Sequence, residues 1–233
     1  MQTPSSPVLD TAKARFNMIE QQIRPWEVAD ATVLALLDAV PRDQFTPDAM
    51  RGLAYADIAI PLTTPTNEAE SMLHPKAQAR MVQDVALKAD DNVLHIGTGS
   101  GFTAALLAKQ AKSVLSLEIN PTLAQMASGN LNRAGISNVD VRVADAAADN
   151  FQACSAQGPY DVIVLSGTVG EVPQTLLNLL KVGGRLFAYV GEDPVVRATL
   201  VTRASDTGFS TTQPWDFVAP RLRNFPAASS FRF

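Results

Sequence analysis

Hydrophobic and polar residues follow two different spacings along the chain. Between residues 11 and 40, apolar side chains recur at three- and four-residue spacing, as on the buried face of an amphipathic helix. From residue 93 onward, short and almost continuous apolar runs alternate with helical patterns. Such runs are typical of strands that are buried on both faces of a parallel sheet. The chain therefore divides into a helical start and a longer part in which strands and helices alternate.

The helical start is followed by a segment without clear periodicity. Apolar positions predict helices over residues 11–23 and 31–40, the second with Asp30 as a typical N-cap. A further helical turn is predicted near residues 47–50. Residues 57–75 are rich in proline and predict a long, irregular loop, which we expect to border the active site because long loops often carry function.

The alternating part predicts a layered fold. After a helix over residues 77–87, strands are expected over residues 93–96, 113–117, 139–143, 160–165, 185–190 and 195–205, with helices over 102–110, 121–135 and 173–180. The last segment, from Phe217 to the C-terminus, is expected to pair at the sheet edge. This order implies an α/β fold with a doubly wound, mostly parallel, Rossmann-like sheet. We assign residues 1–76 to a helical N-terminal region with its loop and residues 77–233 to one compact domain.

A glycine-rich turn joins the first predicted strand to its helix. Its residues, all candidate cofactor contacts, are Gly97, Thr98, Gly99, Ser100 and Gly101. Glycine permits positive φ and lets a ligand approach the backbone closely. A dinucleotide-binding turn has the spacing G-x-G-x-x-G, but here Phe102 stands in place of its third glycine. The G-x-G-x-G spacing resembles the first motif of S-adenosylmethionine-dependent methyltransferases; a turn that serves packing alone is the alternative.

The ends of the following strands carry further candidates. In doubly wound sheets, ligands bind outside the carboxyl ends of the strands. Glu118 ends the second strand and could accept hydrogen bonds from both hydroxyls of a ribose, with Ile119 beside it to pack on an adenine. Asp145, followed by Ala146, ends the third strand and could accept from an adenine amino group. Residues 165–167 end the fourth strand and should face the transferring methyl group.

Composition narrows the function classes. The chain has 233 residues, 46% of them hydrophobic, so it can bury a sizeable core. Only 18% are charged and the net charge is −4, which argues against a broad nucleic-acid-binding face. One cysteine, Cys154, and two histidines, His74 and His95, leave no pattern for a disulfide framework or a metal site. No signal sequence or long apolar span is visible, so we expect a cytoplasmic protein without a membrane partner.

Several segments resemble one methyltransferase family. They are MIEQQIR at residues 18–24, VPRDQFTP at 40–47, AYAD at 54–57, VLHIGTGSG at 93–101, PYDVIV at 159–164 and LLKVGGRL at 179–186. Together they resemble the protein-L-isoaspartate O-methyltransferase family over roughly residues 15 to 191. The resemblance implies the Rossmann-like fold of class I methyltransferases and the cofactor S-adenosyl-L-methionine. It also implies protein repair, by methyl transfer to the free carboxylate of an isoaspartyl residue in a damaged protein partner.

The acceptor half of the family pattern is changed. The family has T-I-S-x-P before the helix that precedes the glycine-rich turn, whereas this chain reads SMLHP at residues 71–75. The family's substrate-contacting serine thus falls on Leu73, which cannot donate a hydrogen bond. Ser71 and His74 are the candidates to supply the donor instead, with ordinary loop residues as the alternative. His95 is a second departure, because the family usually has an acidic residue at this position.

Two other functions remain open at this stage. One keeps the cofactor but methylates a different acceptor, such as a small carboxylic acid. The other is a non-catalytic homologue that binds the cofactor or a partner and has lost its acceptor site. The sequence leaves the acceptor and the oligomeric state undecided.

Overall fold

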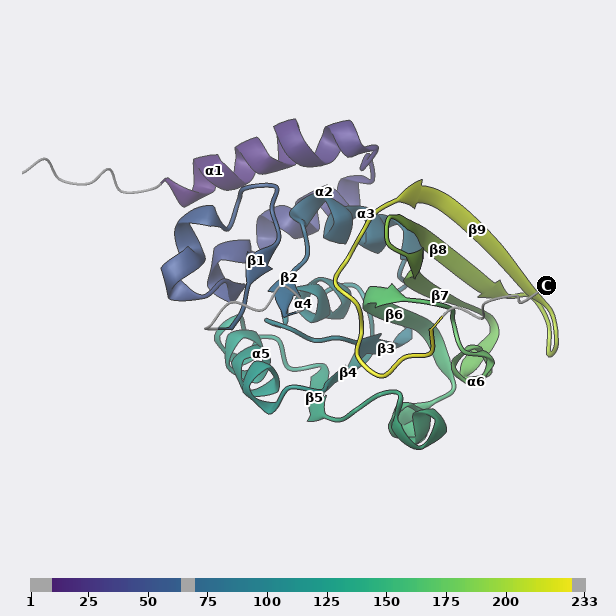
Figure 1. The fold of residues 1–233 in the computed structure, drawn as a ribbon. Coiled ribbons are helices and arrows are strands. Elements are labelled where there is room, and N and C mark those ends of the chain that lie inside the picture. The colour runs from purple at the N-terminus through teal and green to yellow at the C-terminus, as the bar shows by residue number, and fades with distance from the viewer. Residues whose placement is uncertain (1–9, 64–69, 228–233) are drawn as a thin grey trace, which may run out of the picture.

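The computed structural model describes residues 10–63 and 70–227, whose centre is a seven-stranded sheet. Its strand order is β5-β4-β3-β6-β7-β8-β9 (Figure 1). The strands are β3 Asn92–Ile96, β4 Ser113–Glu118, β5 Val139–Val143, β6 Tyr160–Val169, β7 Leu180–Glu192, β8 Val195–Arg203 and β9 Phe209–Asp216. The strands from β5 to β7 pair in parallel, and β8 and β9 are joined by antiparallel pairing. The predicted doubly wound, mostly parallel α/β sheet is confirmed.

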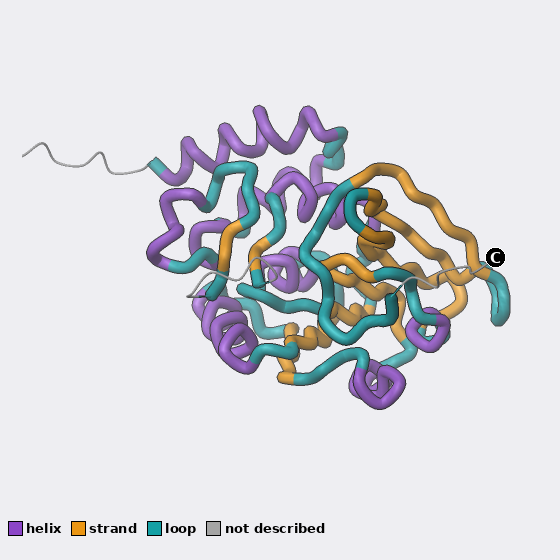
Figure 2. The backbone as a smooth tube through the Cα atoms, in the orientation of Figure 1, coloured by secondary structure: helices purple, strands orange, loops and turns teal. Residues whose placement is uncertain are grey.

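Helices lie on both faces of the sheet (Figure 2). The side chains between the helices and the sheet form two apolar cores. One face carries α3 Pro75–Val85, α4 Phe102–Ala108 and α5 Pro121–Arg133, and the other carries the 3-10 helix η5 Ala148–Gln157 and the short α6 Gln174–Leu177. Along β3, Val93 belongs to the first core and the next residue, Leu94, to the second. Since successive side chains of a strand point to opposite faces, these apolar runs need cover on both sides.

The N-terminal region is helical, as the periodicity predicts. It consists of α1 Thr11–Met18, the π-helical η1 Ile19–Ile23, η2 Arg24–Trp26, α2 Ala31–Ala39, η3 Arg42–Phe45 and η4 Asp48–Leu53. Asp30 caps α2, because its Oδ1 accepts from the backbone N–H of Thr32 at 2.7 Å. Met18 and Leu37 belong to the same core as the helices α3 and α4. The N-terminal region is therefore packed onto the sheet domain through a shared apolar core.

The loop over residues 57–75 is less irregular than predicted. Two short strands, β1 Ile60–Pro61 and β2 Ser71–Met72, pair in an antiparallel manner within it. Pro65 falls in the stretch 64–69, outside the described residues. The pairing was not visible in the sequence because two-residue strands have no measurable period.

Two boundaries after residue 170 also differ. The helix predicted over residues 173–180 ends at Leu177, and β7 begins at Leu180 rather than at residue 185. β7 passes through Gly184, where a Cβ would stand 2.9 Å from the carbonyl oxygen of Lys181. Gly183 and Gly184 therefore belong to an irregular strand and not to the end of a helix. The helix η5 was not predicted, and its residues include Asp149 with φ of 47°.

The C-terminal segment takes a different path from the one predicted. Residues 217–227, here called the crossing segment, leave the sheet edge after β9 and return across the carboxyl ends of the strands (Figure 1). Thr168 at the end of β6 donates its N–H to Pro220 O at 2.8 Å and accepts from Leu222 N at 2.9 Å. The expected edge pairing is wrong for the crossing segment, since its hydrogen-bond partner Thr168 lies on an inner strand, and the edge strand is β9, which ends at Asp216.

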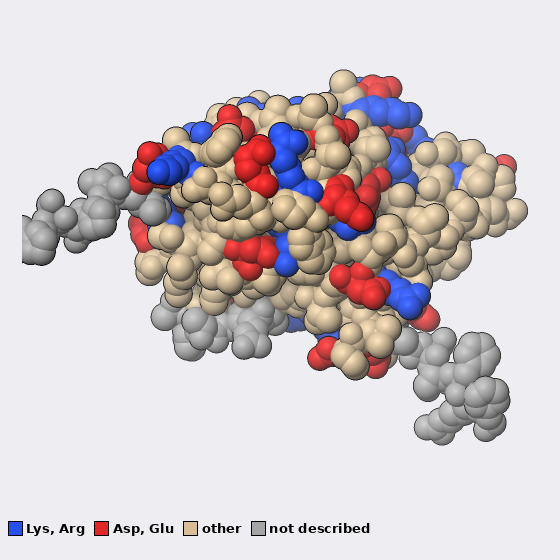
Figure 3. Space-filling model, turned by 90° about the horizontal axis from the view of Figure 1, so that it is seen from above, with Lys and Arg blue, Asp and Glu red and all other residues tan. Residues whose placement is uncertain are grey.

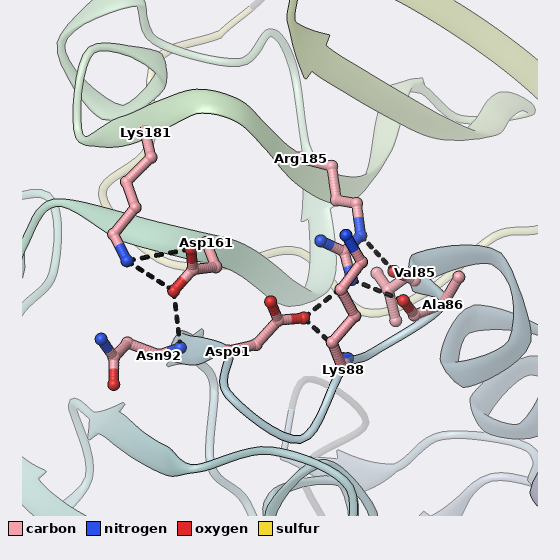
Figure 4. A network of polar contacts seen from close by, with 8 residues as sticks. All are labelled: Val85, Ala86, Lys88, Asp91, Asn92, Asp161, Lys181 and Arg185. Atoms are coloured by element: carbon pink, nitrogen blue, oxygen red, sulfur yellow. Dashed lines mark hydrogen bonds and ion pairs between the residues drawn. The ribbon is translucent and has the colours of Figure 1, made fainter.

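Ion pairs hold the amino ends of the strands together (Figure 4). Lys181 Nζ lies 2.8 Å from an Asp161 carboxylate oxygen, which also accepts from the N–H of Asn92. Burial opposes the ionised carboxyl of Asp161, but these hydrogen bonds outweigh it and lower its pKa. Arg185 bridges Asp91 at 2.9 Å to the C-terminal end of α3. This end of the sheet is rigidly tied, and the opposite end remains for the functional site.

Charges of both signs are interspersed on the face seen from above in Figure 3. Ion pairs on the helical region include Arg15 with Asp38 and Arg24 with Glu20. Among the helices of the described ranges, none has the length and apolar character needed to cross a membrane.

Candidate functional site

A cleft opens at the carboxyl ends of β3, β4, β5 and β6. Its volume is about 700 Å³ including the open solvent at its mouth. The candidates from sequence that line it are Ser71, Gly97, Gly99, Glu118, Ile119, Asp145 and Ala146. They come together because the carboxyl ends of parallel strands meet at one edge, next to the point where the strand order reverses between β3 and β6.

The glycine-rich turn has the backbone shape that its glycines predict. The φ angles of Gly97, Gly99 and Gly101 are 89°, 55° and 88°, values that disfavour other residues. At Gly99 a Cβ would stand 3.3 Å from Leu62 at the cleft, and at Gly101 it would stand 3.2 Å from the backbone of Ala127 in α5. The lack of a side chain at Gly99 therefore keeps space open in the cleft, and its lack at Gly101 lets α5 pack against the turn.

Glu118 fastens this turn to the end of β4. One carboxylate oxygen accepts from Gly99 N at 2.8 Å and the other from Asn120 N at 3.0 Å. The residue is only 5% exposed, but it lines the cleft. Each carboxylate oxygen can accept a further hydrogen bond. The two oxygens are thus held in a fixed orientation in which a pair of hydroxyls on a ligand could bind.

Asp145 lies at the end of β5, where its oxygens are also engaged. Oδ1 accepts from Ala147 N at 3.0 Å, and Oδ2 accepts from the Asn224 side chain at 2.6 Å. Ile119 and Ala146 contribute apolar surface to the same part of the cleft. A flat apolar ring with a polar edge could pack against Ile119 and Ala146 and donate a hydrogen bond to Asp145.

Thr98 and Ser100 lie beside this cleft, in an adjoining recess of about 250 Å³. Ser71, Leu73, Phe102 and Ser166 also line the recess. Gly101 lines neither space; it is the N-cap residue of α4. The glycine-rich turn thus separates two connected spaces, and Ser71 and Ser166 border both of them.

His74 does not line either space. Its Nδ1 lies 3.0 Å from the carbonyl oxygen of Asp57, and its ring packs edge-on against Phe217 at 5.5 Å. Lys76 Nζ lies 2.7 Å from the same aspartate. The structure therefore brings Ser71 to the cleft but leaves His74 in a polar cluster at the start of α3.

Leu73 is held by a fully buried arginine. Its carbonyl oxygen accepts from Arg42 Nη2 at 2.7 Å, and Arg42 also donates to the Gln78 side chain. Gln78 in turn donates to Thr103 at 2.8 Å. Burial lowers the pKa of Arg42 to about 9, which leaves it charged at neutral pH. The VPR segment of the sequence thus fixes the backbone of the loop that carries Ser71 and Leu73.

His95 lies under the glycine-rich turn and is fully buried. Its two ring nitrogens are each 2.8 Å from a serine hydroxyl, Ser116 on β4 and Ser166 at the end of β6. Burial lowers its pKa to about 3, so the ring is neutral near pH 7. The sequence did not predict these contacts of His95 with Ser116 and Ser166. It did predict that residues 165–167, which include Ser166, face the transferring methyl group.

The crossing segment supplies site residues that the sequence did not reveal. Pro220, Arg221, Leu222, Arg223 and Phe225 line the cleft. Arg223 lies 3.3 Å from Glu70, which accepts from Asn120 beside Glu118 at 2.9 Å. These residues have no motif or period, so only their position in the fold places them at the site.

Comparisons with known proteins agree on one family. A family model described as "Protein-L-isoaspartate(D-aspartate) O-methyltransferase" matches residues 13–218. A protein-L-isoaspartate O-methyltransferase of Methanoculleus marisnigri is 38% identical over 179 residues, 77% of this chain and 78% of the relative. One of Methylorubrum extorquens is 34% identical over 228 residues, 97% of this chain and 96% of the relative.

Solved structures show the same fold. A Plasmodium falciparum chain, described as a protein-L-isoaspartate O-methyltransferase in complex with S-adenosyl-L-homocysteine, aligns with a TM-score of 0.76 at 18% identity. The alignment covers 91% of this chain and 98% of that chain.

Proposed function

Because the chain belongs to the protein-L-isoaspartate(D-aspartate) O-methyltransferase family, we propose that it methylates the free carboxylate of L-isoaspartyl residues in damaged proteins. The methyl donor is S-adenosyl-L-methionine. The observation that carries the proposal is the family match together with the hydrogen bond between Gly99 and Glu118, both of which line the cleft.

The cleft suits an adenosyl group. Side chains at Gly97 or Gly99 would fill it, since a Cβ at Gly97 would lie 3.1 Å from Leu222. Glu118 would bind the sugar hydroxyls through the free lone pairs of its two oxygens. Ile119 and Ala146 would contact the purine faces, and Asp145 would accept from the amino group. Ser100 and the backbone of Thr98, in the recess, would face the amino-acid end of the cofactor, while the Thr98 hydroxyl stays bonded to Ser116.

The chemistry needs little from acids or bases. The bound cofactor supplies a methyl group on a positively charged sulfur. The acceptor carboxylate is already ionised at pH 7, since carboxyl pKa values lie near 4. The protein therefore acts by aligning the carboxylate and by keeping water away, and alignment can contribute up to about 7–11 kcal/mol in ideal cases. Leu62, Leu222 and Phe225 provide the apolar wall.

The acceptor side differs from the family pattern, and Ser71 is our candidate donor there. It keeps a hydroxyl and borders both the cleft and the recess. His74 would have to lose its contact with the Asp57 carbonyl oxygen before it could donate a hydrogen bond to the acceptor carboxylate. Leu73 presents only an apolar side chain to the recess, so one donor to the carboxylate is lost. A hydrogen bond to a charged group contributes about 1.5–3 kcal/mol, so we expect a slower enzyme rather than an inactive one.

Two measurements test the proposal. Calorimetry should detect binding of S-adenosylhomocysteine, and an assay should show methylation of an isoaspartyl peptide but not of its aspartyl isomer. Absence of binding at millimolar ligand would refute the cofactor assignment.

The variant Leu73→Ser should turn over the peptide faster, because it restores the missing donor.

Leu73 also favours a second candidate, the same methyl transfer to a small carboxylic acid. A smaller acceptor would need fewer hydrogen-bond donors in the recess. A panel of small acids assayed beside the peptide separates the two, and robust peptide turnover would remove the second. A homologue without any activity is the third possibility, which sustained turnover with any acceptor would exclude.

A further inference from the structure

A chain of hydroxyl groups and one imidazole runs through the interior from the glycine-rich turn to the cleft. Thr98 Oγ1 lies 2.6 Å from Ser116 Oγ, and Ser116 Oγ lies 2.8 Å from His95 Nδ1. His95 Nε2 lies 2.8 Å from Ser166 Oγ. Thr98, Ser116 and His95 are each at most 3% exposed, whereas Ser166 is only partly buried. The chain thus has a closed inner end and an open outer end.

Strand register brings these groups together. His95 on β3 stands opposite Ser116 on β4 and opposite Val164 on β6. Opposite residues of neighbouring strands present their side chains on the same face. Ser166, two positions beyond Val164, returns to that face at the strand end. Its position is fixed from the far side, since a Cβ at Gly167 would stand 2.7 Å from the crossing segment at Pro220.

The buried end decides which way the hydrogens point. A neutral imidazole carries one N–H, so the chain has two possible directions. If Ser166 donates to His95, the hydrogens run inward and end on the Thr98 hydroxyl, whose only hydrogen-bond partner within the described residues is Ser116. That would leave a buried hydroxyl hydrogen without an acceptor, which is unfavourable because the hydrogen has also lost its bond to water. In the outward direction every buried hydrogen has an acceptor, and His95 donates through Nε2 to Ser166.

The outward direction leaves the Ser166 hydrogen for a ligand. Ser166 borders both the cleft and the recess, and Ser71 is the other hydroxyl residue in the described chain that does so. The Leu73 side chain faces the same recess without a donor. A hydroxyl that has its oxygen occupied by an imidazole N–H and its hydrogen free suits an anionic oxygen.

We propose that Ser166 is a second hydrogen-bond donor to the acceptor carboxylate, beside Ser71, and that His95 is the positioning residue that keeps the Ser166 hydrogen directed into the site. The assignment of the ligand as a carboxylate rests on the proposed function. Burial also keeps the ring neutral through the range in which carboxylates are ionised, since the pKa of His95 is about 3. His95 therefore neither attracts the substrate by charge nor removes a proton.

The free-energy balance predicts which kinetic constant changes. The acceptor oxygen is fully charged before the methyl group arrives and becomes less charged as the ester forms. A donor to that oxygen therefore stabilises the bound substrate at least as much as the transition state. Interactions of this kind lower KM without raising kcat. We expect Ser166→Ala to raise KM for an isoaspartyl peptide by about 10- to 150-fold and to change kcat less.

Matched variants separate positioning from structural damage. Ser166→Thr keeps the hydroxyl and should restore most of the affinity for the peptide. Ser210→Ala, at an exposed serine on β9, should leave both constants unchanged.

His95→Gln can place an amide N–H near the Nε2 position and should retain more peptide affinity than His95→Leu. The affinity for S-adenosylhomocysteine, measured by calorimetry, should stay within about twofold in Ser166→Ala. A fall in that affinity with an unchanged KM for the peptide would assign Ser166 to the cofactor and overturn the inference.

A second readout does not depend on activity. The chain has two histidines, so a nitrogen-15 NMR spectrum of labelled protein can be assigned with the His74→Gln variant. His95 should appear as the neutral Nε2–H tautomer at pH 7. The Nδ1–H tautomer would overturn the inference, because Ser166 would then have to donate inward. If wild-type protein fails to methylate the peptide, the proposed function fails, while the tautomer still decides the direction of the chain.

Discussion

At the scale of single residues, the site depends on polar groups that are held by the backbone before any ligand binds. Glu118 is oriented by Gly99 N and Asn120 N, and His95 by two serine hydroxyls. Preorganised groups of this kind need no rearrangement when a ligand arrives. Changes at these positions should therefore alter binding or acid sensitivity more than the fold.

Replacing Glu118 tests the sugar-binding assignment. Glu118→Gln keeps the size of the side chain but removes its charge and replaces one acceptor oxygen with a donor. We expect the Kd for S-adenosylhomocysteine to rise roughly 10- to 100-fold, as the loss of one hydrogen bond to a charged group implies. Calorimetry measures this directly. Glu171→Gln, at an exposed glutamate, is the matched control, and equal effects of the two variants would contradict the assignment.

Replacing His95 tests its burial as a neutral group. Its pKa is about 3 in the folded protein, against about 6.5 for an unperturbed histidine. Between these values the unfolded chain binds a proton that the folded one does not. The free energy of unfolding therefore falls as pH drops from 6.5 toward 3, by up to about 1.4 kcal/mol per pH unit.

The variant His95→Gln should lose this part of the acid sensitivity. Urea unfolding between pH 6.5 and 4 measures the slope for both proteins. His74→Gln provides the comparison, because it removes the only other histidine. A slope in His95→Gln equal to that of the wild type would show that His95 is charged or exposed.

At the scale of elements, the loop that carries the acceptor candidates is fixed by a helix far from it in sequence. Arg42 in η3 is fully buried and donates to the Leu73 carbonyl and to Gln78 on α3. It also lies with its guanidinium carbon 5.2 Å from the Phe102 ring. The N-terminal region therefore shapes the recess without lining it.

Arg42→Ala should be strongly destabilising. It leaves two buried acceptors without a donor and opens a cavity, and we expect a loss of about 3–5 kcal/mol in the free energy of unfolding. Chemical denaturation measures it. Arg51→Ala, which breaks an exposed ion pair with Asp48, should cost less than about 1 kcal/mol. Similar losses for both variants would contradict the structural role of Arg42.

At the scale of the whole molecule, ion pairs stabilise one end of the sheet and the candidate site lies at the other end. Ion pairs tie the amino ends together, Lys181 with Asp161 and Arg185 with Asp91 (Figure 4). The carboxyl ends open into the cleft. The crossing segment closes that open end through three hydrogen bonds with Thr168, made by Ala219, Pro220 and Leu222. One part of the chain thus completes a site that the motifs begin more than 100 residues earlier.

Removing the crossing segment tests its contribution to binding. A chain that ends at residue 217 keeps all the strands of the described sheet, so it should unfold cooperatively. It loses Leu222 and Arg223 from the cleft wall, and burying one leucine side chain contributes about 1.5–3 kcal/mol. We expect the Kd for S-adenosylhomocysteine to rise at least about tenfold by calorimetry. A chain that ends at residue 227 is the control, and equal affinity of the two would contradict the prediction.

Local patterns were enough for much of the fold. Apolar runs, the G-x-G-x-G turn and the acids at strand ends predict the parallel sheet and bring Gly97, Gly99, Glu118 and Asp145 to one cleft, because parallel strands end on the same side. Boundaries were less accurate where an element is short or irregular. The pairing of β1 with β2 and the start of β7 depend on contacts with other strands, not on a period of their own.

The sequence by itself determined the family, the layered α/β architecture and the strand ends on which a nucleotide-binding cleft is built, since each of these depends on periodicity or on residues close together in the chain. Only the tertiary structure decided that Ser166 joins His95, that Arg42 holds Leu73, and that the C-terminal residues cross the site. These contacts join residues that lie 31 or more positions apart in the chain. Such pairs leave no local pattern, and packing alone brings them together.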